Sequence, residues 1–312
     1  MTSDIDSILK KLNRKELLEL AHTKKINIPK NWSIQLIMEL LSQNIEVGEI
    51  QKSESKLTKF KEKPEVAPII TIKDLQKKFD NVKAIDGLSL EIRKGELFSL
   101  LGPNGAGKTT TLNILTGIVQ PTKGNAVIDG FDVAKNASEV KKIIGVCPQE
   151  ATVYSFLNAR ENIELFGKLH SLSKNQIEKR ADRMLELLGL TDASYRRAGG
   201  YSGGMLRKLN LIMALINEPK IAFLDEPTVG MDARARRNTW EFIGSLKGED
   251  KTIILTTHYI EEAETLSDRV GIIDFGKLIE LGTPEELVEK YGVNNLEQVF
   301  LNITGRRLME GL

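Results

Sequence analysis

A glycine-rich segment, LLGPNGAGKTT at residues 100–110, has the residue types and spacing of a phosphate-binding loop, G-x-x-x-x-G-K-[ST]. Glycines let the backbone turn tightly and direct amide groups at phosphate oxygens, and the following helix adds its positive end. Lys108 supplies a charge to the outer phosphates, and the Thr109 hydroxyl can bind magnesium. Many glycine-rich loops are only turns, but here strand, glycines, Lys-Thr and helix coincide. The predicted phosphate-binding residues are Gly102, Pro103, Asn104, Gly105, Ala106, Gly107, Lys108, Thr109 and Thr110.

Two consecutive carboxylates end a second apolar stretch, IAFLDE at residues 221–226. Asp225, at the end of a buried strand, would lie beside a magnesium ion, usually with a water molecule between them. Glu226, at the strand tip, is placed to polarise an attacking water. Many strands end in acidic residues without any chemical role, but the phosphate loop upstream favours the catalytic interpretation. We therefore predict Glu226 as a catalytic residue and Asp225 as a nucleotide and magnesium ligand.

A second glycine-rich segment, YSGGMLRKLN at residues 201–210, has the features of a helix start that holds a phosphate. Ser202 can cap the helix and offer a hydroxyl, and Gly203 and Gly204 expose amides at its N-terminus. A plain capped helix would explain the serine but not the paired glycines. The chain therefore contains two candidate phosphate sites. The buried face of this helix is predicted to contain Met205, Leu209, Ile212, Met213 and Ile216.

The helices and strands that must position these residues are predicted by the hydrophobic pattern of the chain after residue 68. Short apolar runs such as LFSLL, KKIIGVC, TIILTT and RVGIID alternate with helical patterns, which predicts an α/β fold with a mostly parallel sheet. Residues 155–190 interrupt this alternation with helical patterns, one opened by a capping box of Ser173 and Gln176. A further helix is predicted to start at GTPEEL, capped by Thr283.

Composition excludes several classes of protein. The chain has 312 residues, a net charge of +1, 41% hydrophobic and 28% charged residues, and one cysteine. It has no apolar run near the roughly 18 residues of a membrane span, no signal peptide and no internal disulfide framework. The balanced charge gives no general argument for a nucleic-acid partner. A guanine-specific Asn-Lys-x-Asp motif is absent, which disfavours a GTPase.

With these segments in place, roughly residues 68–305 resemble the ATPase subunits of ABC transporters. GPNGAGKTT is similar to their Walker A segment, IAFLDE to Walker B, and YSGGM to the signature usually written LSGGQ. VCPQE contains Gln149 at the position of the Q-loop glutamine, VGMD ends in Asp232 like the D-loop, and LTTHYIEEAE contains His258 at the position of the switch histidine. The helical insertion falls between Gln149 and the signature, as it does in that family.

The resemblance implies a P-loop NTPase core of mostly parallel sheet, an antiparallel β subdomain and a helical subdomain at about residues 150–214. It implies ATP and Mg²⁺, and hydrolysis assisted by Glu226 and His258. Two such ATPase domains pair head to tail, so that the phosphate loop of one faces the signature of the other, which would explain two phosphate sites in one chain. The implied magnesium contacts are Thr109, Gln149 and Asp225. The further implied nucleotide contacts are Tyr201, Ser202, Gly203, Gly204 and Asp232.

Phe79 occupies the position of an aromatic residue that stacks on adenine in this family, although an ordinary core position is the alternative. Tyrosine is more usual there, and Asp80 replaces a common glycine. Met205 replaces the last glutamine of the signature. This variant, VGMDARARRNTWEFI and the tail NNLEQVFLNITGRRL resemble the ABC-2-type exporter branch, which includes drug and antibiotic resistance systems. We therefore expect export, a second ATPase subunit as a homodimer partner, a separate membrane permease, and a cytoplasmic protein peripheral to the inner face of the membrane.

The expected domains are a small all-α N-terminal domain (1–47), a charged linker (48–66), the ATPase domain (67–290) and a C-terminal tail (291–312). The N-terminal domain resembles the SAP type, which binds DNA in several proteins, and it is locally basic. We favour a protein-docking module over DNA binding there, with contact to anionic lipid as an equal alternative. The rival function is an ABC ATPase acting on nucleic acid or ribosomes. It is disfavoured because the chain has one set of motifs and no long coiled coil.

Overall fold

The structure is a computed structural model that describes residues 67–247 and 251–305, together with the single positions Leu17, Ala21, Ile26, Ile37, Met38, Leu40 and Leu41. The chain divides into two compact units, residues 1–66 and 67–312. In the first unit, Leu17, Ala21, Ile37 and Leu41 are helical and buried. Apart from the seven positions named above, residues 1–66 lie outside the described residues, and so do residues 306–312 of the predicted tail.

The larger sheet of the second unit is mostly parallel, as predicted. Strands β9, β3, β8, β7 and β6 are parallel, and β10 joins the β9 edge in the antiparallel direction. Every residue of β3, β7 and β8 is buried, because helices and the smaller sheet cover both faces. The strands in spatial order are β10 (Lys277–Gly282), β9 (Arg269–Asp274), β3 (Leu97–Leu101), β8 (Thr252–Thr257), β7 (Ile221–Asp225) and β6 (Ile144–Cys147).

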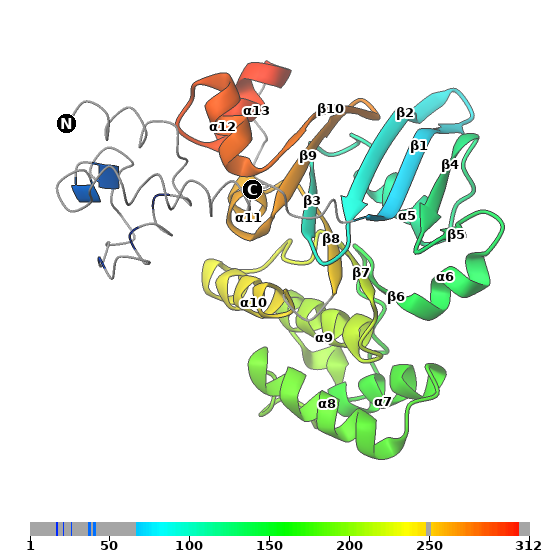
Figure 1. Ribbon diagram of the computed structural model, residues 1–312. Helices are drawn as coiled ribbons and strands as arrows, with labels where there is room; N and C mark the ends of the chain where they lie inside the picture. The colour runs from blue at the N-terminus through cyan, green and yellow to red at the C-terminus, as the bar shows by residue number, and fades with distance from the viewer. Residues whose placement is uncertain are drawn as a thin grey trace. The chain divides into compact units, whose positions relative to one another are not determined.

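The smaller sheet is antiparallel, which confirms the β subdomain that the resemblance implied. Its strands in spatial order are β2 (Val82–Arg93), β1 (Pro68–Phe79), β4 (Lys123–Ile128) and β5 (Phe131–Asp132). Apolar residues of β1 and β2, among them Ile72 and Leu88, are buried in one cluster with Phe98 of β3 and Leu112 of α5 (Lys108–Leu115). The two sheets thus enclose the helix that follows the phosphate loop (Figure 1).

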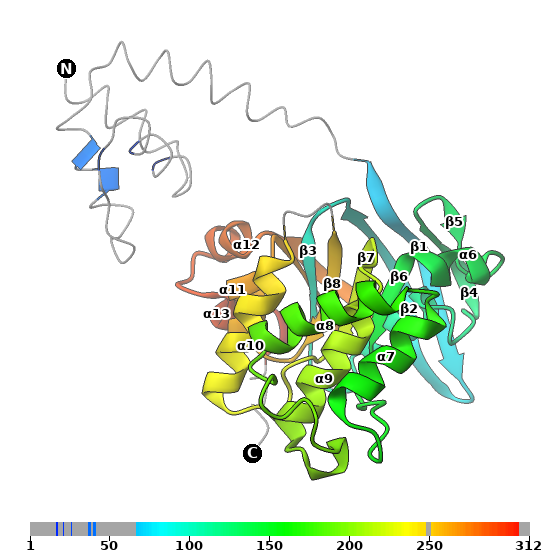
Figure 2. The same ribbon diagram turned by 90° about the horizontal axis from the view of Figure 1, so that it is seen from below.

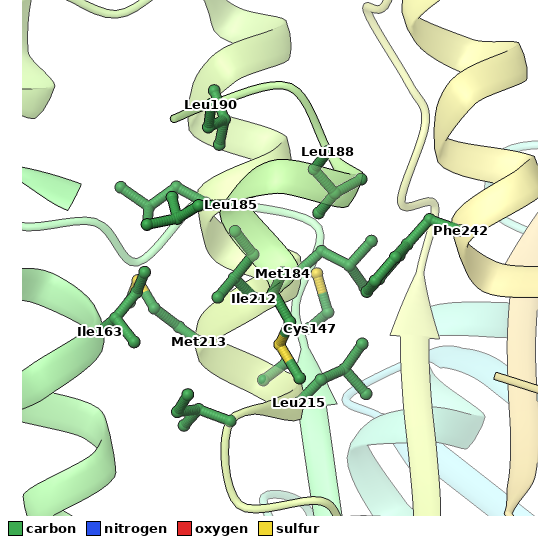
Figure 3. Packing of buried hydrophobic residues seen from close by; sticks show 14 of the residues in the cluster. Cys147, Ile163, Met184, Leu185, Leu188, Leu190, Ile212, Met213, Leu215 and Phe242 are labelled. Atoms are coloured by element: carbon green, nitrogen blue, oxygen red, sulfur yellow. The ribbon is translucent and has the colours of Figure 1, made fainter. Parts of the chain in front are cut away.

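The helical insertion comprises α7 (Ala159–Leu169), α8 (Lys174–Leu187), a short 3-10 turn η1 (Ala198–Gly200) and α9 (Gly203–Leu215). The predicted capping box of Ser173 and Gln176 opens α8. In Figure 1, α9 and α10 (Ala233–Ser245) lie between the parallel strands and the pair α7 and α8, and Figure 2 shows the same helices from below. Figure 3 shows the cluster that joins these parts, with Met184 of α8, Ile212 of α9, Phe242 of α10 and Cys147 of β6.

The remaining helices are α6 (Ala137–Ile143), α11 (Ile260–Leu266), α12 (Pro284–Tyr291) and α13 (Leu296–Thr304). Helix α12 begins with the predicted capping box of Thr283 and Glu286. Leu296, Val299 and Phe300 of α13 are buried on one face, in a cluster with residues of α11, α12 and β9. The part of the predicted C-terminal tail that the structure describes therefore packs against α11, α12 and β9 of the same unit.

Gly145 of β6 allows α9 to lie close against the sheet, and this gives a test of the fold. A Cβ atom at Gly145 would lie 2.1 Å from the Ala214 carbonyl oxygen of α9. Because backbone must shift to relieve such a contact, Gly145→Ala should lower the free energy of unfolding by about 1–3 kcal/mol, as overpacking does. Thermal unfolding of the purified protein measures this loss.

Gly244 of α10 provides the matched control, because a Cβ there would meet nothing closer than Leu266 Cδ2 at 4.0 Å. Gly244→Ala should stabilise the protein by about 0.5–1 kcal/mol, the helical advantage of alanine over glycine. A Gly145→Ala protein that unfolds at the wild-type temperature would contradict the packing described for α9.

Candidate functional site

The phosphate loop connects β3 to α5 at the edge where the parallel strands end. Two of its glycines are required by close approach of the backbone. A Cβ at Gly102 would lie 2.2 Å from the Ile273 carbonyl oxygen, and one at Gly107 would lie 2.5 Å from the Ala84 carbonyl oxygen. Gly107 also has a φ of +103°, in the region that only glycine adopts easily. The loop therefore has the tight turns that its glycines predict.

Lys108 is the first residue of α5 and is only 4% exposed. Its Nζ donates hydrogen bonds to the carbonyl oxygens of Gly102 at 2.8 Å and Pro103 at 3.1 Å, and it forms an ion pair with Glu226 Oε1 at 3.3 Å. Burial lowers the pKa of Lys108, although the negative charge of Glu226 opposes that shift. The ammonium group is thus folded across the loop and paired with a carboxylate.

Asp225 ends β7 beside the Thr109 hydroxyl, which donates a hydrogen bond to Asp225 Oδ1 at 3.2 Å. The Thr256 hydroxyl of β8 donates a hydrogen bond to the same oxygen. Burial raises the pKa of Asp225, while these two hydrogen bonds oppose the shift. Nothing in the sequence analysis singled out Thr256, but a threonine inside the fully buried stretch TIILTT is a signal of a polar role.

The paired oxygens of Thr109 and Asp225 fit a magnesium ion, which prefers oxygen ligands and keeps waters and phosphate oxygens in its shell. Among the described residues, no group of three or more His, Cys, Asp or Glu side chains could hold a metal ion.

Glu226 is buried and contacts three of the predicted site residues. Its Oε1 lies 3.3 Å from Lys108 Nζ and 3.2 Å from His258 Nδ1, and its Oε2 accepts a hydrogen bond from Gln149 Nε2 at 3.2 Å. The His258 contact has an ion-pair distance but not the alignment of a hydrogen bond. Burial raises the pKa of Glu226, but His258 and Lys108 outweigh it and the net shift is downward. Glu226 is therefore ionised at neutral pH.

The backbone of Glu226 is held in a left-handed conformation with a φ of +47°. Its amide lies 3.1 Å from both the carbonyl oxygen and the hydroxyl of Thr256, and donates to them. This anchor holds the carboxylate at the tip of β7 over the phosphate loop. The structure thus brings together the predicted residues Lys108, Thr109, Gln149, Asp225, Glu226 and His258.

The signature segment is not joined to this cluster within the chain. Ser202 caps α9 and accepts a hydrogen bond from the Met205 amide at 3.3 Å, as predicted. The Tyr201 hydroxyl is turned into the helical subdomain and donates to the Ala193 carbonyl at 2.6 Å. Gly203 has open space around it. No hydrogen bond or ion pair of the described residues links residues 201–204 to the phosphate loop, so the nucleotide contacts of Tyr201, Ser202, Gly203 and Gly204 remain predictions.

The structure shows what surrounds Phe79 and Asp232 within the chain, and their predicted nucleotide contacts remain predictions. Phe79 is 45% exposed, with Lys77 Nζ 4.7 Å from its ring centre, so the alternative of an ordinary core position is wrong. Asp80 has a φ of +47°, which explains why glycine suits this position. Asp232 caps α10 by accepting a hydrogen bond from the Ala235 amide at 2.8 Å.

Comparisons with known proteins agree with this geometry. Residues 85–229 match the ABC transporter family. The chain is 41% identical over 230 residues to the daunorubicin resistance ATP-binding protein DrrA3 of Streptomyces coeruleorubidus, covering 74% of this chain and 73% of that protein. This chain belongs to the ABC transporter ATP-binding family. It is an ATPase subunit of a transporter, and it binds and hydrolyses ATP.

Other relatives of this ABC ATPase support the same assignment. It is 38% identical over 231 residues to the linearmycin resistance ATP-binding protein LnrL of Bacillus subtilis, covering 74% of each chain. A solved ATP-binding subunit of an ABC transporter superposes with a TM-score of 0.70 at 25% identity, covering 76% of this chain and 99% of that one. A dimeric ATP-binding cassette bound to ADP and Pi gives a TM-score of 0.63 at 28% identity, covering 69% and 98%.

The comparisons bear on the rival function, and the structure bears on the question of a membrane span. The relatives named above, which are resistance ATP-binding proteins, give no support to the rival function on nucleic acid or ribosomes. In the described part of the chain, no helix is both long enough and apolar enough to cross a bilayer.

The raised pKa of Asp225 predicts that Asp225→Asn stabilises the ABC ATPase near neutral pH. Because the pKa of Asp225 is higher in the folded protein, its protonated form stabilises the folded state. This stabilisation is complete below the ordinary pKa of 3.8 and is lost as the pH rises through the folded-state pKa. The amide oxygen of asparagine can still accept both threonine hydrogen bonds. We expect the Tm at pH 7.5, without nucleotide or magnesium, to rise by about 2–4 °C, the shift for ~1 kcal/mol in a domain of this size. The gain should shrink toward pH 4.

Asp232→Asn is the control with the opposite sign. The hydrogen bond from the Ala235 amide is the largest cause of the lowered pKa of Asp232. The ionised Asp232 therefore stabilises the folded state above its ordinary pKa of 3.8, and this stabilisation is lost as the pH falls through the folded-state pKa. Asp232→Asn should therefore not raise the Tm at pH 7.5. An Asp225→Asn protein less stable than the wild type at pH 7.5 would contradict the account of Asp225.

Proposed function

We propose that this ABC ATPase works as a homodimer that couples ATP hydrolysis to export through a separate membrane permease. The observation that carries the proposal is that the phosphate-binding cluster is assembled within one chain while the signature segment stands apart from it. A signature that takes no part in its own chain's site is available to the site of a second copy. The dimeric cassette among the solved relatives and the resistance proteins among the sequence relatives support this reading.

In the proposed site, the Lys108 ammonium and the backbone amides of residues 102–110, other than Pro103, bind the ATP phosphates, and Phe79 stacks on the adenine. Thr109 and Asp225 would hold Mg²⁺, with Gln149 beside it, and the ion would neutralise charge that develops on the phosphates. Glu226, ionised and held by three neighbours, orients and polarises the attacking water.

Across the proposed dimer, His258 donates a hydrogen bond to the γ-phosphate from its own chain. The partner copy supplies the Ser202 hydroxyl and the amides of Gly203 and Gly204, with Tyr201 and Asp232 nearby. Positioning and charge stabilisation account for most of the catalysis of phosphoryl transfer, so residues from two chains can share it. Closing the dimer excludes bulk water from the reacting groups, and hydrolysis allows it to reopen.

A groove of about 300 Å³ supports the proposed contact with a permease. Its lining includes Ile118, Thr152, Phe166 and Met213, so residues near the end of α5, on α7 and on α9 share it. Thr152 lies three residues after Gln149, and Ile118 is 65% exposed. Exposed apolar side chains beside a groove are typical of a protein contact site. We propose that the permease docks here, which would hold the ATPase at the inner face of the membrane.

Lys108→Ala and Glu226→Gln should each lower ATP turnover by at least about 10²-fold, the contribution of a positioned acid or base or of a lost phosphate contact. Lys108→Ala should lose most ATP affinity because the ammonium charge is gone. Glu226→Gln should still bind ATP and should form a dimer with ATP and magnesium. Phosphate release, nucleotide binding and light scattering after gel filtration measure these three properties.

Glu261→Gln is the matched control, because Glu261 is an exposed glutamate of α11. It should hydrolyse ATP at the wild-type rate. Wild-type turnover in Lys108→Ala and Glu226→Gln would refute the proposed roles, and a Glu226→Gln protein that stays monomeric with ATP would refute the dimer.

A pull-down tests the permease. The tagged Glu226→Gln protein, with ATP, magnesium and mild detergent, should co-purify from native membranes with a multi-span membrane protein. Adding Ile118→Asp should abolish this capture because it replaces an exposed apolar side chain of the groove with a charge. Ile279 is a matched control, since it is 40% exposed on β10, away from the groove, and Ile279→Asp should retain the capture. Recovery of nucleic acid or ribosomes without a membrane protein would overturn the export reading.

A further inference from the structure

Glu262 of α11 is a completely buried acid that the proposed mechanism does not use. Its Oε1 accepts hydrogen bonds from the Thr228 hydroxyl at 2.7 Å and the Trp240 Nε1 at 2.8 Å. Its Oε2 is buried without a well-formed hydrogen bond to any described residue. Burial raises the pKa of Glu262, although the side chains of Thr257, Thr228 and Trp240 oppose the shift. The second oxygen is a cost to stability, while the hydrogen bonds to the first oxygen fix the Thr228 and Trp240 side chains against α11.

Thr228 connects this carboxyl group to the proposed catalytic glutamate. It lies two residues after Glu226, in the segment 226–232 that leads from β7 to α10. The segment begins with the left-handed Glu226 and contains Gly230, with a φ of +74°. It carries little regular structure of its own, so a side-chain bond to a helix behind it restricts its position. The bond from Thr228 to Glu262 provides this restraint.

Helix α11 connects the same carboxyl group to the switch histidine. His258 lies four residues before Glu262. Tyr259 directly precedes the helix, and its amide donates a hydrogen bond to the Thr257 hydroxyl at 2.9 Å. The His258 and Tyr259 rings have centroids 4.3 Å apart. His258 therefore lies two residues before the helix whose first turn contains Glu262.

Trp240 connects α10 to the same point. The Arg236 guanidinium lies 5.6 Å from the Trp240 ring centre and 5.1 Å from the Tyr259 ring centre. This stack joins α10 to the start of α11 by a second route, independent of the Thr228 bond. Removing the indole N–H alone would therefore weaken packing between the helices without releasing the segment 226–232.

We propose that Glu262 is a positioning residue that, through Thr228, fixes the segment 226–232 and so the Glu226 carboxylate relative to His258. Glu226 and His258 must act on the same phosphoryl group, so their separation has to be held while ATP is bound. The hydrogen bond from Thr228 ties the chain that follows Glu226 to the helix that follows His258. The inference rests on the roles proposed above for Glu226 and His258.

The test is Thr228→Val in the full-length protein, which removes the hydroxyl and keeps the shape of the side chain. We expect kcat for ATP to fall about tenfold, as small misplacements of reacting groups do, with KM changed by less than about twofold. Glu262→Gln should keep kcat within about twofold of the wild type, because the amide oxygen can still accept both hydrogen bonds. Steady-state kinetics and thermal unfolding are measured on each variant.

Trp240→Phe is the matched control, because it removes the other hydrogen bond to the same oxygen and keeps an aromatic ring under Arg236. It should lower the Tm at least as much as Thr228→Val while leaving kcat near the wild-type value. Equal losses of kcat in Trp240→Phe and Thr228→Val, or a wild-type kcat in Thr228→Val, would show that Glu262 has a structural role only. Glu226→Gln is measured in parallel. If it keeps turnover, the proposed site is wrong, whereas an inactive Glu226→Gln beside an unaffected Thr228→Val overturns only this inference.

Discussion

The buried ion pair of Lys108 and Glu226 is the contact on which the rest of the site depends. Neither charge could stay buried alone, because an isolated buried ion is strongly unfavourable. The two residues come from elements far apart in the chain, the start of α5 and the end of β7, so the pair forms only when β3 and β7 occupy the same sheet with their carboxyl ends together. The fold therefore brings the two buried charges together, and each satisfies the other.

The same edge of the sheet supplies the partners that keep this pair in place. Thr256 at the end of β8 binds Asp225 and the amide of Glu226, while Gln149, just beyond β6, reaches the other oxygen of Glu226. Each of these residues follows or ends a parallel strand, so their proximity is a consequence of the topology. The left-handed backbone of Glu226 is tolerated because these contacts over-determine its position.

Local signals were enough to predict the phosphate loop, the alternation of strands and helices, and the capping boxes of α8 and α12, because each depends on residues a few positions apart. The sequence analysis missed Thr256 and Glu262, whose partners are distant in the chain. A buried threonine or glutamate looks the same in sequence whether or not it meets a partner. For Phe79, the motif predicted the position along the chain but could not decide between exposure and burial, which depends on how the β1–β2 hairpin is covered.

Within the chain, backbone hydrogen bonds join the turn before the signature to the segment that follows Gln149. The Ala198 amide donates to the Leu157 carbonyl at 2.9 Å, and the Gly199 amide donates to the Ser155 carbonyl at 2.8 Å. These bonds tie the segment that follows Gln149 to the turn that precedes the signature. Gln149 itself touches Glu226, so the two candidate phosphate sites are the ends of one connected path through the helical subdomain. A displacement of Gln149 would therefore act on the segment 150–157, which these two backbone hydrogen bonds join to the turn before the signature.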